Sequence, residues 1–436
     1  MKRTSPIFSR RGLIRSAAGV LGLAGPLSRS FWVPSARAAT GGGSEPKFIF
    51  IFAQGGWDVT YALAPVFDNS AVQMPDGSSQ AETDGIAWVS HPDRPEVDAY
   101  FNDYASRTCM VHGLEVRSIA HERCTRILLT GGTSANADDF LTRIGSASTG
   151  APLPFVAFSG PCYAAENPES VVRIGLDGQF TSLADGSAVA TSDPPLTLPS
   201  ASSEALEEAL VRKRVATAAA AAGRGRQTKI LGAYKELLDR TDAVVELQSV
   251  LSDAGEDSES QALAAVSLMA SGAARCAMIQ ELGFQSLGWD HHSDITRQGP
   301  SFASLFTTLN SLIAALIATP GMSGAPLIDE VTVVGCSELG RDPRLNSAGG
   351  KDHWTTTSLM MFGAGIRGGT TLGAYSSSMA ATPIVLDTAE LDADSKKGGV
   401  VLEPAHIGAT LMQLAGLDPL EEVGAPPILG ILEAGS

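Results

Sequence analysis

Residues 47–58, KFIFIFAQGGWD, place an apolar run with five strand-favouring Phe and Ile residues shortly before a glycine turn that ends in an aspartate. An apolar run without alternation predicts a strand buried on both faces, as in a parallel sheet covered by helices. The two glycines let the backbone turn sharply and expose the carboxylate of Asp58. Because parallel sheets bind ligands at the carboxyl ends of their strands, the sequence predicts a site at this end of the strand.

Strand-like and helix-like segments alternate along the rest of the chain. Strands are expected within residues 107–116, 261–282, 329–340 and 358–369, and helices within 261–282, 301–321 and 406–419. This alternation predicts an α/β sandwich whose mostly parallel central sheet carries helices on both faces. We expect one domain over residues 47–436, with a helical insertion at about residues 203–257.

The N-terminal 38 residues have the layout of a twin-arginine secretory signal. The pair Arg10-Arg11 is followed by the apolar run SAAGVLGLAG and by the small-residue cleavage signal ARA at residues 36–38. Residues 39–46 read as a linker. A membrane anchor retained at the N-terminus is the alternative, although the apolar run is short for a spanning helix. The sequence therefore predicts export to the periplasm or beyond, with the twin-arginine machinery as a partner.

The net charge of the mature chain limits the classes of partner that it is expected to bind. Residues 1–38 hold seven basic and no acidic residues, so their removal leaves 24 basic against 47 acidic residues and a net charge of −23. No Lys/Arg-rich run follows, so nucleic acid is not an expected partner. No other stretch is expected to span a membrane.

Aspartates and histidines gather where predicted strands end. Carboxylate oxygens and neutral imidazole nitrogens both bind divalent metals such as Zn²⁺, Mn²⁺ or Fe²⁺. For each motif alone, a helix cap or a surface turn is an alternative. Together they predict a site for one or two divalent ions (Zn, Mn, Fe, Mg or Ca), built from Asp58, Asp290, His292, Asp352 and His353, with Glu338 and Arg341 beside it.

Four segments carry a resemblance to a known family. GGWDVTYALAP, VRSIAHERCTRILLTGG, GWDHHSD and SELGRDPRLNSAGGKDHWTTTSLMMFGAGIRGG resemble the uncharacterised family called domain of unknown function 1501. That family is grouped with the alkaline phosphatase and sulfatase superfamily. The resemblance implies a sandwich with metal at the strand ends. It also implies that Asp58, Asp352 and His353 serve one metal, and Asp290 and His292 the other, with Glu338 and Arg341 in the second shell or facing the substrate.

His121 is where the sequence departs from the superfamily pattern. Counting back nine residues from Thr130, as in a sulfatase signature, reaches His121 instead of Cys, Ser or Thr, and Cys124 is out of register. Ser118 and Thr125 lie close enough to be alternative nucleophiles. His121 itself has three interpretations: a metal ligand, a catalytic nucleophile toward phosphorus, or a structural hydrogen-bond donor.

The expected function follows from the metal constellation and the superfamily resemblance. It is an exported, metal-dependent hydrolase of phosphate or sulfate esters, with a small-molecule or saccharide ester as substrate. The missing nucleophile motivates the alternative, a non-catalytic metal-binding or cell-envelope protein that keeps the scaffold. Outside the site, His112 is predicted to be a satisfied core histidine.

Overall fold

An eight-stranded sheet forms the centre of the computed structural model, which describes residues 45–174 and 200–433 with gaps between residues 222 and 253. The strand order is β12-β4-β11-β8-β1-β7-β5-β6, and every strand except β11 runs in the same direction. The strands are β1 (Lys47–Ala53), β4 (Thr108–Glu115), β5 (Leu153–Ala157), β6 (Val171–Arg173), β7 (Ala274–Glu281), β8 (Val331–Cys336), β11 (Thr356–Gly363) and β12 (Thr370–Leu372). The predicted α/β fold with a mostly parallel sheet is confirmed.

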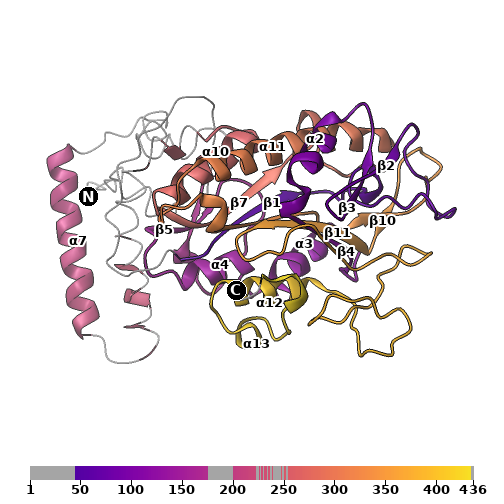
Figure 1. The fold of residues 1–436 in the computed structure, drawn as a ribbon. Helices are drawn as coiled ribbons and strands as arrows, with labels where there is room; N and C mark the ends of the chain where they lie inside the picture. Colours follow the sequence, from indigo (N-terminus) through magenta and orange to yellow (C-terminus); the bar gives the residue numbers. More distant parts are fainter. Residues whose placement is uncertain are drawn as a thin grey trace.

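Helices cover both faces of the sheet, because β1 is apolar on both sides (Figure 1). Ile49 and Ile51 point into a core shared with α2 (Pro95–Tyr104), α10 (Ser258–Ala270) and α11 (Gln298–Ala318). Phe48 and Phe50 point to the opposite core, shared with α3 (His121–Thr130), α4 (Phe140–Ser146) and α12 (Pro404–Leu414). This alternation along one strand is the two-residue period of β structure, and each buried side chain contributes about 1.5–3 kcal/mol.

Shorter elements complete the described chain. They are the hairpin β2 (Ser79–Thr83) and β3 (Ile86–Ser90), the ribbon β9 (Gly340–Arg341) and β10 (His353–Trp354), the 3-10 turns η1 (Val59–Tyr61), η2 (Ala105–Arg107), η3 (Pro168–Ser170), η4 (Phe284–Ser286), η5 (Ile295–Arg297), η6 (Leu327–Asp329) and η7 (Leu429–Ile431), and the last helix, α13 (Pro419–Glu422). Helix α7 (Ala201–Ala221) opens the predicted insertion. The predicted export signal, residues 1–38, lies outside the described residues.

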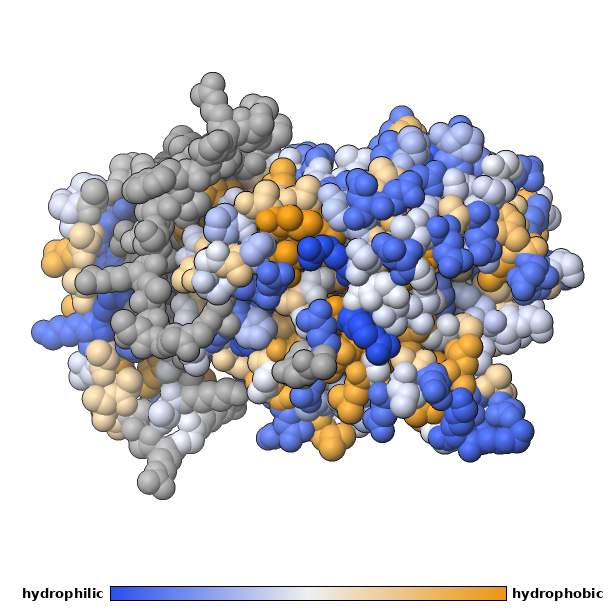
Figure 2. Space-filling view, viewed as in Figure 1, coloured by the Kyte–Doolittle hydropathy of each residue, from blue (hydrophilic) through white to orange (hydrophobic). Residues whose placement is uncertain are grey.

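Helix α11 corrects the expectation that no stretch after the signal is long and apolar enough to span a membrane. Residues Ile295–Ala318 meet both criteria, although half of the tested window is buried. Phe302, Leu305 and Leu309 of this helix are fully buried in the core beside the sheet, where α11 packs against α10 and α2. Figure 2 shows hydrophilic and hydrophobic residues interspersed over the described part of one face. The length and apolarity of α11 are therefore those of a helix that packs on the sheet.

Candidate metal centre

One edge of the sheet collects the predicted site residues. Asp290 and His292 follow the carboxyl end of β7, Glu338 follows β8, and His121 begins α3 after β4. His353 joins them because β11 runs antiparallel, so its amino end lies at the same edge as the carboxyl ends of its neighbours. The sheet topology thus brings together residues as far apart in sequence as 121 and 353.

Three imidazoles and one carboxylate meet at this edge. Ligand atoms of His121, Asp290 and His353 all lie within 4.8 Å of one another. The Nε2 atoms of His292 and His353 are 2.9 Å apart, and each lies 3.1 Å from Oδ1 of Asp290. Nε2 of His121 lies 3.3 Å from the other oxygen, Oδ2. Edges of roughly 3 Å between nitrogen and oxygen atoms match neighbouring ligands around an ion with bonds of about 2.0–2.1 Å.

The far nitrogen of each ring is fixed by a hydrogen-bond acceptor. Nδ1 of His121 donates to Oε1 of Glu338 at 2.8 Å, and Nδ1 of His353 donates to the carbonyl oxygen of Ile119 at 2.7 Å. Nδ1 of His292 donates to Oδ1 of Asp352 at 3.0 Å. Acceptors of this kind select the tautomer that leaves the Nε2 lone pair free, as is common behind metal-binding histidines.

These lone pairs fit a divalent cation. Nε2 of His121 is buried, and it faces Oδ2 of Asp290 at 3.3 Å. Two Nε2 lone pairs at 2.9 Å, those of His292 and His353, repel unless a proton or a metal ion lies between them. Imidazole nitrogens with one carboxylate are a donor set for zinc, manganese or iron. Within the described chain, the three histidines and Asp290 form a single cluster at this edge of the sheet.

The charged groups around Asp290 determine which side chains of the cluster carry a proton when no metal is bound. Burial raises the pKa of Asp290, but hydrogen bonds from His121, His353 and Arg341 outweigh it and hold the pKa well below its usual range. The hydrogen bonds to Asp290 and Glu338 raise the pKa of His121 to about 9. His121 therefore carries a proton at neutral pH when nothing competes for it, and a metal ion would have to displace that proton.

Buried Arg341 ties the loops of the site together. Its Nη2 donates to Oδ1 of Asp290 at 2.6 Å and to the carbonyl oxygens of Gly55 and Trp289. Its Nε donates to the carbonyl oxygen of Gly56 at 2.8 Å. Arg341 thus lies beside the cluster and anchors both the GGWD turn and the segment that carries Asp290.

Glu338 ties the first turn to His121. The amide of Gly55 donates to both carboxylate oxygens of Glu338, at 2.9 and 3.1 Å. Gly55 has a φ of +126°, and a Cβ there would lie 2.7 Å from the amide nitrogen of Asp290. A side chain at this position would push apart the two segments, so the turn needs glycine.

Asp58 is not brought into the cluster. Its Oδ2 forms a fully buried ion pair with Nζ of Lys351 at 2.7 Å, and its Oδ1 accepts from the amide of Thr60 at 3.0 Å, capping η1. The expectation that Asp58 converges with the other metal ligands is wrong in this structure. The physical reason is Lys351, whose buried ammonium group needs a carboxylate and takes this one.

Asp352 was predicted to be a metal ligand, but it lies behind the ring of His292 and not at the centre of the cluster. Its carboxylate is 64% exposed and contacts Nδ1 of His292, the nitrogen that faces away from the cluster. Asp352 therefore orients a ligand, whereas its neighbour His353 reaches the centre. Two contributors had no signal in the sequence: the carbonyl of Ile119, because any residue supplies one, and Lys351, whose partner is 293 positions away.

Comparisons with known proteins found similar solved structures and one family. Solved structures similar to this chain include a protein of the alkaline phosphatase superfamily from Vibrio parahaemolyticus (TM-score 0.38, 9% identity, covering 96% of this chain and 78% of that one). Others are a 2-O GAG sulfatase (0.40, 10%, 90% and 76%) and a phosphonate monoester hydrolase from Silicibacter pomeroyi (0.38, 10%, 90% and 78%). No curated protein matched.

A family match covers the site residues that come later in the sequence. Residues 193–389 match the family described as "Protein of unknown function (DUF1501)". This stretch contains Asp290, His292, Glu338 and His353, but not His121 or Asp58. Residues 193–389 are therefore similar to the DUF1501 family, which is the resemblance that the motifs predicted.

Proposed function

We propose that this chain is an exported, metal-dependent hydrolase of phosphate or sulfate esters. The observation that carries the proposal is the meeting of three Nε2 atoms with Asp290, each ring held from behind by an acceptor. The ester class comes from the superfamily that the motifs resemble. Export is part of the proposal because residues 1–38 have the sequence layout of a twin-arginine signal.

His121, Asp290, His292 and His353 are the residues that would hold the ion. A divalent cation there would polarise the ester oxygen and offset the negative charge that develops on it. Glu338 holds the ring of His121, and Asp352 holds that of His292. Arg341 keeps Asp290 ionised and in place, which preserves the negative charge that a cation needs.

A second candidate function is motivated by the residue at the start of helix α3. His121 occupies the first position of α3, where the superfamily has a nucleophile. The nearby alternatives on this helix are not accessible, because Cys124 is fully buried and Thr125 is 4% exposed. This observation favours a metal-binding protein of the cell envelope that has kept the scaffold without the reaction.

Metal content and turnover test the two candidates together. The mature chain, produced with its export signal, is assayed for bound metal and for hydrolysis of aryl phosphate, phosphodiester and aryl sulfate esters. His121→Ala and Asp290→Ala should abolish both metal binding and turnover. Asp394→Ala, which removes an exposed carboxylate far along the chain, should change neither.

Each outcome has one meaning. Stoichiometric metal with turnover supports the hydrolase. Stoichiometric metal without turnover of any ester class supports the second candidate and sinks the first. A mature protein that retains no metal and shows no metal affinity refutes both.

A further inference from the structure

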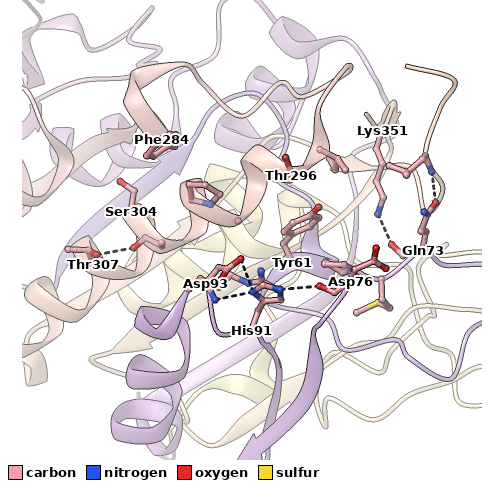
Figure 3. Close-up of a pocket in the computed structure, with 18 residues that line it drawn as sticks. Tyr61, Gln73, Asp76, His91, Asp93, Phe284, Thr296, Ser304, Thr307 and Lys351 are labelled. Atoms are coloured by element: carbon pink, nitrogen blue, oxygen red, sulfur yellow. Dashed lines mark hydrogen bonds and ion pairs between the residues drawn. The ribbon is translucent and has the colours of Figure 1, made fainter. Parts of the chain in front are cut away.

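A pocket of about 710 Å³ lies apart from the metal centre. Its wall combines η1, the loop before α2, and the first turns of α11, with Tyr61 and Thr296 facing the space between them (Figure 3). None of the four residues proposed to hold the ion lines it. Its volume is in the range of small-molecule sites, which span about 300–1,000 Å³.

Arg94, at the start of α2, is the unusual group in this wall. The residue is 2% exposed, and its Nε and Nη2 are buried without a hydrogen-bond partner. Its guanidinium lies over the ring of Tyr61, 5.3 Å from the centroid. Burial lowers the pKa of Arg94 to about 10, which still leaves it charged at neutral pH. A buried charge without a partner is costly, so this cation calls for an anion.

The nearby carboxylates are already engaged or hydrated. Asp98 accepts from Nε1 of Trp88 at 2.6 Å and from Oγ of Ser90 at 2.8 Å. Asp58 is paired with Lys351. The side chain of Asp93 is 85% exposed and lies at the mouth of the pocket. Among the described residues, none forms an ion pair with Arg94.

The two unpartnered nitrogens lie on one edge of the guanidinium. Nε–H and Nη2–H point the same way, and their spacing matches two oxygens of a carboxylate, phosphonate or sulfonate. The lining also includes the apolar side chains of Phe284, Ile295 and Pro300. The pocket therefore joins one oxyanion-binding edge to a surface that suits a hydrocarbon or aromatic group.

We propose that this pocket binds a small organic oxyanion, with the anionic group on Arg94 and the organic part against Phe284 and Ile295. Arg94 lines this pocket, as Phe284 and Ile295 do. The oxyanion supplies the partner that Arg94 lacks. This binding requires neither the metal nor turnover.

Direct binding measurements test the proposal on the purified mature protein. Benzoate, phenylphosphonate and benzenesulfonate are titrated by calorimetry, with neutral benzamide as the uncharged match. We expect at least one anion to bind and benzamide to bind at least about tenfold more weakly, because a hydrogen bond to a charged group is worth about 1.5–3 kcal/mol. The three anions show which oxyanion geometry the site prefers.

Four variants locate the site. Arg94→Met should weaken the best anion at least about tenfold, whereas Arg367→Met, at an exposed arginine, should not. Ala303→Phe fills the pocket from α11 and should block binding while Arg94 is intact, so the test survives if Arg94→Met fails to fold. His121→Ala should leave binding unchanged.

Three results would overturn the proposal. The first is that no anion binds, or that benzamide binds as well as the anions. The second is that Ala303→Phe binds like the wild type. The third is that His121→Ala abolishes binding, which would place the anion at the metal centre instead.

Discussion

Asp290→Asn and Asp352→Asn are expected to differ in metal affinity, because the two carboxylates stand on opposite sides of the His292 ring. Oδ1 of Asp290 lies 3.1 Å from Nε2, the side of the cluster, whereas Oδ1 of Asp352 lies 3.0 Å from Nδ1, the side away from it. The first change replaces a charged carboxylate ligand with a neutral amide, which binds a divalent ion more weakly. The second removes only the charge of a group that orients a ligand, and asparagine still offers an oxygen to accept from Nδ1.

The structure gives a magnitude for each change. A unit charge about 4 Å from another contributes about 4 kcal/mol at an effective dielectric constant of about 20, which is roughly a thousandfold in Kd. The carboxylate of Asp290 is 45% exposed, so solvent screening leaves at least about a hundredfold loss for Asp290→Asn. Loss of an orienting partner typically costs about 10–100-fold. Exposure of 64% puts Asp352→Asn at the low end, about tenfold.

Competition between the protein and a chromophoric chelator for Zn²⁺ or Mn²⁺ measures both changes. Asp394→Asn is the matched control, since it neutralises an exposed carboxylate in another loop. Thermal unfolding without metal checks that the three variants fold alike. If Asp352→Asn weakens binding as much as Asp290→Asn, then Asp352 is a ligand and its placement behind His292 is wrong.

Three further changes probe the frame around the site. Asp58→Asn leaves the Lys351 ammonium buried and uncompensated, so urea unfolding should show a loss of about 3–5 kcal/mol, and adding Lys351→Met should restore most of it. Gly55→Ala should cost about 1–3 kcal/mol in thermal unfolding, whereas Gly132→Ala, with open space at its Cβ, should be nearly neutral. Burial lowers the pKa of His112 to about 4 in the fold, so its contribution is full above pH 6.5 and is lost as the pH falls toward 4. His112→Gln should therefore flatten the fall in stability between pH 6.5 and 4, by up to about 3 kcal/mol, and an unchanged slope in urea titrations would contradict this assignment.

The sequence was most informative where local pattern determines structure. The unbroken apolar run of β1 predicted a strand covered on both faces, and its residues do divide between two cores. The topological rule that parallel strands share a carboxyl edge was enough to place Asp290 and His292 there. His353 arrives at the same edge by another route, at the amino end of the antiparallel strand β11. His121 also joined them, although only the spacing to Thr130 had pointed to it.

Contacts between distant segments limited the prediction of the site. Asp58 looked like a ligand because it leaves the first strand after a glycine turn, yet the ion pair with Lys351 decides its role. Asp352 and His353 looked like a tandem pair of ligands. Both contact the same imidazole, but at opposite nitrogens, and no local pattern tells which residue of the pair reaches the centre.

The two nitrogens of His121 constrain what chemistry this edge can perform. Nδ1 is occupied by Glu338, so Nε2 can either bind a metal or attack an ester, but not both at once. If Nε2 binds a metal, no accessible side chain in the first turn of α3 is left to attack, because Cys124 and Thr125 are buried. Ester cleavage would then depend on an attacking water or on the half-buried hydroxyl of Ser118, three residues before His121, because no nucleophile on the helix itself would be available. A histidine at this helix start would therefore change the route of the proposed reaction, or remove it, while it adds a nitrogen ligand to the proposed metal site.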